Sequence, residues 1–140
     1  METDKKVLYT AKVATTGGRT NGAAKSDDGQ LDIKLSTPGT SRPGTNPEQL
    51  FAAGWSACFE GAMGIAAKQL NVALPPETTI NAEVDLTLSP ANGYTLQARL
   101  NISIPDVDRE IAQQLVDAAH QTCPYSKAIR GNVDVEINLI

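Results

Sequence analysis

The sequence predicts one α+β domain in which antiparallel strands pack around a long buried central helix and a second helix. Hydrophobic residues make up 41% of the 140 residues, enough for one hydrophobic core. Alternating apolar and polar residues recur on both sides of a nearly continuous apolar run at residues 50–67. A later segment, residues 105–123, has helical spacing. We therefore treat residues 1–140 as a single domain.

Charge and cysteine content exclude several classes of protein. The net charge of −4 argues against a nucleic-acid-binding surface, which needs clustered Lys and Arg. Two cysteines are too few for a secreted disulfide scaffold, and with a single histidine they do not form a metal-ligand cluster. The charged N-terminus, residues 1–6, has no apolar signal core. We expect a cytoplasmic protein that binds no metal, no nucleic acid and no membrane.

The N-terminal third is predicted to contain two half-buried strands. Apolar residues alternate with more polar ones over residues 7–13 and again over residues 31–35. A glycine-rich stretch, residues 16–22, and a turn at residues 27–29 separate the two runs. Residues 37–46 are rich in Pro, Gly, Thr and Ser, which indicates a loop.

The central apolar run is predicted to be a buried helix rather than a membrane span. Asn46 is a good N-cap residue, Pro47 suits the first helical position, and Gln49 completes a sequence similar to a capping box. Glu60 in the middle of the run would be costly inside a bilayer. The many small side chains would let another backbone approach closely, so we expect a helix partner.

The C-terminal half is predicted to contain a hairpin, the second helix and a last strand. Asn92-Gly93 is a typical hairpin turn. Pro105 opens the helix, and Pro124 should end it near residue 123. His120 is expected on the exposed side of this helix, without a catalytic role. The predicted elements are strands over residues 80–88 and 94–104, a helix over residues 105–123 and a strand over residues 133–139.

The two cysteines have different sequence settings. Cys58 lies inside the apolar helix, where a cysteine is commonly a small inert core residue. Cys123 precedes a proline at a helix end, where a sulfur atom can be partly exposed. A reactive thiol needs its thiolate form, which a cationic neighbour favours by lowering the pKa. These patterns alone leave Cys58 as a core residue or a nucleophile, and Glu48 as a helix-start carboxylate or a functional group.

Two long motifs resemble those of the organic hydroperoxide resistance proteins, a branch of the family that includes the osmotically inducible peroxidases. Residues 44–59 resemble the active-site helix of that branch, and residues 123–133 resemble its second motif. Residues 15–19 and 31–38 match its N-terminal hairpin. The resemblance covers essentially the whole chain in the right order, and each long motif contains one cysteine.

The resemblance implies a cysteine-based thiol peroxidase that reduces alkyl and fatty-acid hydroperoxides to alcohols. Cys58 matches the attacking thiol, which becomes a sulfenic acid. Cys123 matches the resolving thiol, which condenses with the sulfenic acid to an intramolecular disulfide. Arg19 matches the arginine that holds the thiolate, and Glu48 matches the glutamate that orients the guanidinium group.

The resemblance also implies partners. Family members bind no cofactor, take electrons from the dihydrolipoyl groups of lipoylated enzyme subunits, and form intertwined homodimers with active sites at the interface. Glu48 and Cys58 are ten positions apart, which is about 15 Å along an unbroken helix. Either the helix bends near Gly54, or Arg19 and Glu48 act on Cys58 of the partner subunit.

The substrate pocket is expected to be apolar, because aromatic residues make up only 4% of the chain and the lining should come mainly from Ala, Leu and Ile beside a few larger side chains. Such a pocket suits organic hydroperoxides better than hydrogen peroxide. Trp55 stands where family members often have tyrosine, and Arg42 is an extra cation that we expect to be solvated. The candidate pocket residues are Phe51, Trp55, Phe59, Met63 and Tyr125.

Three other functions remain open. One is a peroxidase of the osmotically inducible type. The others are a thiol redox sensor and a binding module for apolar ligands, neither of which would turn over. A ligand-binding module has no need of two thiols, an arginine and a carboxylate together. A sensor would be distinguished by a single slow oxidation without turnover.

Overall fold

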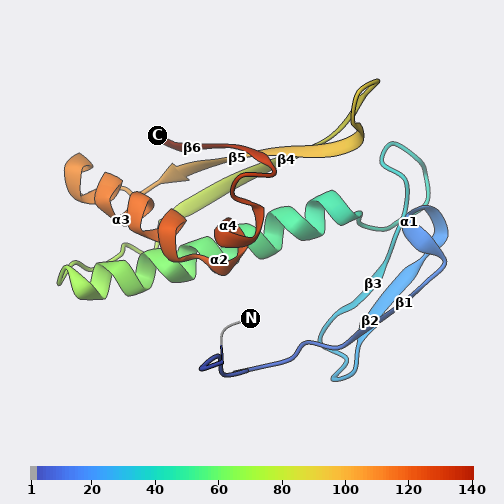
Figure 1. Cartoon of the computed structure of the whole chain (residues 1–140), viewed down its shortest axis with the longest axis horizontal. Coiled ribbons are helices and arrows are strands. Elements are labelled where there is room, and N and C mark those ends of the chain that lie inside the picture. Colours follow the sequence, from blue (N-terminus) through green and yellow to red (C-terminus); the bar gives the residue numbers. More distant parts are fainter. Residues whose placement is uncertain (1–2) are drawn as a thin grey trace. The chain divides into compact units, whose positions relative to one another are not determined.

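The computed structural model describes residues 3–140, which form two compact units, one ending at Pro47 and one beginning at Glu48. The mixed helix and strand content confirms the α+β class (Figure 1). The elements in chain order are β1 (Val13–Thr16), α1 (Gly18–Asn21), β2 (Ala23–Ser26), β3 (Asp32–Lys34), α2 (Pro47–Gln69), β4 (Thr79–Ser89), β5 (Gly93–Ser103), α3 (Arg109–Thr122), α4 (Pro124–Ile129) and β6 (Asp134–Leu139).

The N-terminal unit is built on an antiparallel sheet with the strand order β1-β2-β3. The short helical turn α1 joins β1 to β2. Gly17 and Gly18 enter this turn with φ angles of 78° and 69°, a left-handed conformation that favours glycine. A Cβ atom at Gly22 would lie 2.0 Å from the Gly18 carbonyl oxygen. The glycine-rich stretch is therefore the compact turn that contains Arg19.

The prediction of a strand over residues 7–13 is wrong except at its last residue, because β1 begins at Val13. Val7, Leu8 and Tyr9 are 76%, 86% and 78% exposed. An alternating pattern produces a half-buried strand only where an apolar surface covers one of its faces, and residues 7–9 are not covered in the single chain. The strand predicted around Ile33 and the loop before Pro47 are confirmed.

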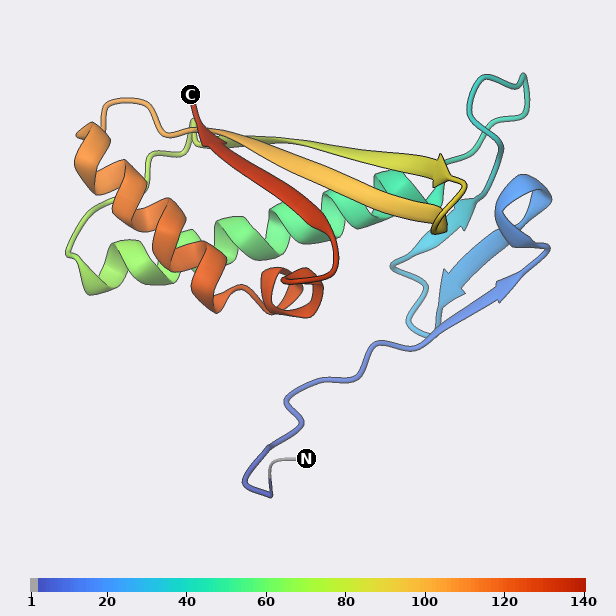
Figure 2. The same cartoon turned by 45° about the horizontal axis from the view of Figure 1, so that its top comes forward.

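The C-terminal unit contains a sheet with the order β4-β5-β6, and α2 and α3 lie against one face of it (Figure 1 and Figure 2). The hairpin of β4 and β5 is antiparallel and turns between Ser89 and Gly93, as predicted. The expectation of antiparallel strands is wrong for β6, which pairs parallel to β5 from Asp134 to Leu139. The chain crosses over through α3 and α4 between these strands, and a helical crossover returns the chain in the same direction.

The core of the C-terminal unit lies between its helices and its sheet. Trp55, Phe59 and Met63 of α2 are completely buried together with Leu100 and Leu115. In the single chain, α2 is buried on the face that contains Trp55, Phe59 and Met63, and its opposite face is open. By length and composition α2 is also apolar enough to cross a membrane, but the core helix of a folded domain passes the same test.

The second helix begins later than predicted and is followed by a helix that the sequence analysis missed. Asp108 caps α3 by accepting a hydrogen bond from the Glu110 N–H at 3.0 Å, whereas Asp106 has a left-handed φ of 61°. As predicted, Pro124 ends α3, but it also opens α4 as its first residue. The expectation that His120 is exposed is wrong, because its side chain is half-buried.

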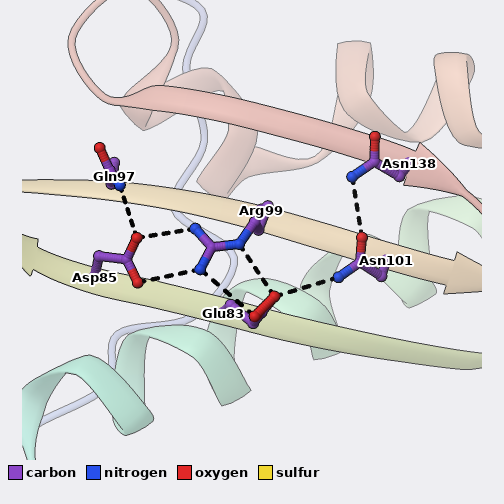
Figure 3. A network of polar contacts seen from close by, with 6 residues as sticks. All are labelled: Glu83, Asp85, Gln97, Arg99, Asn101 and Asn138. Atoms are coloured by element: carbon purple, nitrogen blue, oxygen red, sulfur yellow. Dashed lines mark hydrogen bonds and ion pairs between the residues drawn. The ribbon is translucent and has the colours of Figure 1, made fainter.

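The sheet face opposite the core carries a network of polar side chains (Figure 3). Arg99 of β5 lies between two carboxylates of β4, with Nε 3.1 Å from Glu83 Oε1 and Nη1 2.9 Å from Asp85 Oδ2. The hydrogen bond from Arg99, followed by a second one from Gln97, lowers the pKa of the Asp85 carboxyl group. The polar face and the apolar core face alternate along β5, which fixes the strand register.

Candidate functional site

The two cysteines lie where α2 meets the junction of α3 and α4. Cys58 is half-buried on α2, and Cys123 is completely buried. The expectation that the Cys123 sulfur is partly exposed is therefore wrong. Pro124 starts a new helix at once and turns the chain back over the core, so that Cys123 faces inward. The backbone N–H of Cys123 donates to the Ala119 carbonyl at 2.8 Å and its carbonyl accepts from the Lys127 N–H at 3.0 Å.

The two thiols lie close enough that Cys123 affects the pKa of Cys58, and both are free. Burial raises the pKa of the Cys58 thiol, because a thiolate is poorly solvated there. A hydrogen bond from the Tyr125 backbone acts in the opposite direction and lowers this pKa, while the Cys123 thiol adds to the increase. The net result is a pKa above the ordinary value. The surroundings of Cys58 within its own unit therefore favour the neutral thiol.

A cavity of about 420 Å³ opens beside Cys58. Its walls come from α2 and from the neighbouring parts of α3 and α4, and they are mostly apolar. The polar exceptions are Gln69 and Thr122. A cavity of this size and character suits an apolar ligand with its reactive group at the sulfur. The other lining residues are Gly61, Ala62, Ile65, Ala66, Ala118 and Pro124.

None of the residues predicted to line the substrate pocket borders the cavity beside Cys58. Trp55, Phe59 and Met63 have no exposed surface and belong to the core, and none of them borders the cavity beside Cys58. Phe51 is half-buried and Tyr125 is 44% exposed, with their ring centroids 6.4 Å apart. Helical spacing alone does not separate the core face of α2 from the cavity face, because both are apolar.

Ser126 is a residue of this region that the sequence analysis did not single out. It is completely buried and accepts a hydrogen bond from the indole Nε1 of Trp55 at 3.1 Å. The sequence offered one indication of this role. A buried indole N–H needs a hydrogen-bond acceptor, and Ser126, three residues after Cys123, has one. The bond ties α4 to α2.

Arg19 and Glu48 lie in different units. Arg19 is exposed on α1, and Glu48 is half-buried in the first turn of α2. The helix runs without interruption through Gly54, so no break there shortens the separation of about 15 Å between Glu48 and Cys58. The action of Arg19 and Glu48 on a Cys58 thiolate, in the same or the partner subunit, stays a prediction.

Arg42 is an exposed loop residue, as expected, but its guanidinium group also makes two hydrogen bonds. Its Nε donates to the Leu35 carbonyl and its Nη2 donates to the Asn21 carbonyl, each at 3.2 Å. The guanidinium group thus connects the loop before α2 to the residue that follows β3 and to the end of α1. Within residues 3–140, no group of three or more His, Cys, Asp or Glu side chains is arranged to hold a metal ion.

Comparison with known proteins finds relatives that match almost the whole chain. The family described as OsmC-like protein matches residues 37–138. The chain is 50% identical over 143 aligned positions to the organic hydroperoxide resistance protein of Xanthomonas axonopodis pv. citri (strain 306), covering 99% of each chain.

Solved structures give the same result. The crystal structure of the organic hydroperoxide resistance protein OhrB of Bacillus subtilis superposes with a TM-score of 0.89 at 46% identity, covering 96% of this chain and 100% of that one. A putative organic hydroperoxide resistance protein of Vibrio cholerae O1 biovar eltor, with captopril bound in one of its active sites, gives a TM-score of 0.88 at 37% identity. The match covers 97% of this chain and 94% of that protein.

Proposed function

Because the chain belongs to the OsmC-like family and to its organic hydroperoxide resistance branch, we propose that it is a thiol peroxidase that reduces alkyl and fatty-acid hydroperoxides to alcohols. The observation that carries the proposal is the proximity of the half-buried Cys58 thiol to the buried Cys123 thiol at an apolar cavity. A hydroperoxide with an apolar chain would place that chain in the cavity and its peroxide group at Cys58.

The reaction proceeds in two steps on the protein. The Cys58 thiolate attacks the distal peroxide oxygen, the O–O bond breaks, and the alkoxide leaves and takes up a proton to become the alcohol. Cys58 is then a sulfenic acid. Cys123 attacks its sulfur, the S–S bond forms, the S–O bond breaks, and the leaving hydroxide takes up a proton to become water. The product is the Cys58–Cys123 disulfide.

We propose for Arg19 and Glu48 the roles that the family resemblance implies, and the raised pKa of Cys58 supports them. Burial and Cys123 raise this pKa, so a nearby positive charge would help the nucleophile to become a thiolate. Arg19 would supply that charge and stabilise the negative charge that develops on the peroxide oxygens. Glu48 would hold the guanidinium group by two parallel hydrogen bonds.

The disulfide must be reduced before the next cycle. A dihydrolipoyl group, free or on a lipoylated enzyme subunit, supplies two electrons and two protons and becomes the cyclic disulfide of lipoate. The enzyme itself would need no bound cofactor. We propose that it works in the cytoplasm, where thiols are kept reduced. We also propose that it is a homodimer in which a second copy covers the open face of α2.

The test is hydroperoxide consumption with dihydrolipoamide as the reductant. Wild-type protein should consume tert-butyl or cumene hydroperoxide over many cycles and faster than hydrogen peroxide. Cys58→Ser should abolish consumption, and Cys123→Ser should reduce one equivalent of hydroperoxide when no reductant is present and turn over more slowly than the wild type with dihydrolipoamide, because the Cys58–Cys123 disulfide cannot form. Retained turnover in Cys58→Ser would move the nucleophile elsewhere. A single slow oxidation of the wild type would instead support the sensor.

A further inference from the structure

A hydrogen bond between two fully buried side chains joins the segments that contain the cysteines. The indole Nε1 of Trp55 donates to Ser126 Oγ at 3.1 Å, and neither side chain has any exposed surface. The two residues are 71 positions apart in the sequence. Because water does not reach this bond, removing either group leaves the other without a partner. A buried polar group without a partner lowers the stability of the fold more than an exposed one does.

Each end of the bond lies one helical turn from a cysteine. Trp55 precedes Cys58 on α2 by three positions, and Ser126 follows Cys123 by three positions. Hydrogen bonds hold the Cys123 backbone on both sides, to the end of α3 and to the first turn of α4. Cys123 is therefore rigidly connected to α4, and the position of α4 on α2 sets the separation of the two sulfur atoms.

A second contact shows how closely α4 approaches α2. A Cβ atom at Gly54 would lie 2.9 Å from Tyr125 Oη and 3.3 Å from two carbons of its ring. Glycine at this position lets the Tyr125 ring lie on the helix backbone. The backbone of the same tyrosine hydrogen-bonds to Cys58. A shift of α4 would therefore change two contacts of the Cys58 sulfur together.

We propose that Trp55 and Ser126 are positioning residues whose hydrogen bond seats α4 on α2 and keeps Cys123 Sγ within reach of Cys58 Sγ. Neither residue reacts. The step they serve is disulfide formation, in which Cys123 attacks the sulfur of the Cys58 sulfenic acid and the oxygen leaves as water. The inference rests on the proposed function in one respect, namely that these two cysteines form a disulfide.

The experiment measures the disulfide equilibrium without any hydroperoxide. Full-length variants are equilibrated in mixtures of reduced and oxidised dithiothreitol, and the disulfide fraction gives the equilibrium constant. Trp55→Phe removes the donor and Ser126→Ala removes the acceptor, and each should lower the constant about tenfold, the usual effect of losing one buried hydrogen bond. Ser126→Thr keeps the hydroxyl group and should lower the equilibrium constant less than Ser126→Ala does.

Ser56→Ala is the matched control. It makes the same chemical change on α2, but the Ser56 hydroxyl donates to the Ala52 carbonyl of its own helix at 2.6 Å. Its disulfide equilibrium should equal that of the wild type. Circular dichroism verifies the fold of each variant, and if Ser126→Ala does not fold, Trp55→Phe and Ser126→Thr carry the test.

The double variant separates positioning from general destabilisation. If the two residues act through their shared bond, Trp55→Phe combined with Ser126→Ala loses no more than either single change. Additive losses, or constants equal to the wild type in all variants, overturn the inference. The pH profile of Cys58 alkylation gives a second readout, and it should move to higher pH in Trp55→Phe because the hydrogen bond from the Tyr125 backbone weakens.

The two proposals fail in different ways. A protein whose disulfide equilibrium depends on Trp55 and Ser126, but which consumes no hydroperoxide, supports the inference and overturns the peroxidase function. A protein that turns over hydroperoxide while its equilibrium is insensitive to both residues supports the function and overturns the inference.

Discussion

The guanidinium Nη2 of Arg42 donates a hydrogen bond to the backbone carbonyl of Asn21 at 3.2 Å, which joins the loop before α2 to the turn that contains Arg19. Arg42→Ala should therefore loosen both segments of the N-terminal unit. We expect faster amide hydrogen exchange over residues 18–22 and 37–44, because each lost hydrogen bond weakens the folded state by about 0.5–1.5 kcal/mol.

Arg109→Ala is the matched control for Arg42→Ala. Arg109 also donates from Nη2 to a backbone carbonyl, that of Leu139, at 3.0 Å, but in the C-terminal unit. Its loss should leave exchange over residues 18–22 unchanged. Equal exchange in wild type and Arg42→Ala would show that the Arg42 bonds do not hold this turn.

Arg19→Ala should raise the pKa of the Cys58 thiol if Arg19 supplies the missing positive charge. Burial raises the pKa of Cys58, and a cation at the sulfur would lower it by favouring the thiolate. Below the pKa, alkylation slows about tenfold for each unit of increase, because only the thiolate reacts. Rates of iodoacetamide modification of a Cys123→Ser background, measured from pH 5 to pH 10, give the pKa directly. Identical profiles with and without the Arg19→Ala substitution would remove Arg19 from the site.

The stability of the protein should fall below pH 6.5 because of His120. Burial, and then the positive charge of Arg130, lower the pKa of this imidazole below its ordinary value of 6.5. The unfolded chain therefore binds a proton before the folded chain does, and the contribution of neutral His120 is lost as the pH falls through 6.5 toward the folded pKa. Urea unfolding at pH 8, 6.5 and 5 should show a smaller acid-side loss in His120→Gln. If the stability of the wild type and of His120→Gln falls equally as the pH is lowered, His120 is not the cause of the loss.

Gly54→Ala should disturb the contact between α2 and α4, since its Cβ would lie 2.9 Å from Tyr125 Oη. We expect it to lack the usual gain of about 0.5–1 kcal/mol for replacing glycine in a helix. A Cβ at Gly64 meets no atom within 4 Å in the single chain, so Gly64→Ala should show that gain. In a Tyr125→Ala background, Gly54→Ala should show the usual gain in stability, because the ring that its Cβ would meet is absent. Equal stabilisation by both alanines in urea unfolding would argue against a close contact.

The local elements of this fold were predictable where the sequence has strong local signals. Asn46-Pro47 placed the start of α2, Asn92-Gly93 placed the hairpin, and Pro124 placed the end of α3. Each signal depends on backbone chemistry within a few residues. The start of α3 was misplaced because Asp106 and Asp108 both precede the helix and only Asp108 adopts the capping geometry.

The burial of the two cysteines was not predictable from the same signals. Cys58 looked buried because its helix is apolar, and Cys123 looked accessible because it ends a helix. Burial depends on which segments pack together, and the short helix that begins at Pro124 covers Cys123. The parallel pairing of β6 escaped prediction for the same reason, since strand direction follows from the path of the crossover.

That parallel pairing bears on the order in which the chain folds. The hairpin of β4 and β5 needs only a short loop to close, but α3, α4 and β6 join the unit through contacts between more distant parts of the chain, and such contacts form slowly. We expect the segment containing Cys123 to join the structure late. The two thiols would then meet only in a nearly complete protein, so that a newly made chain has little opportunity to oxidise before it has folded.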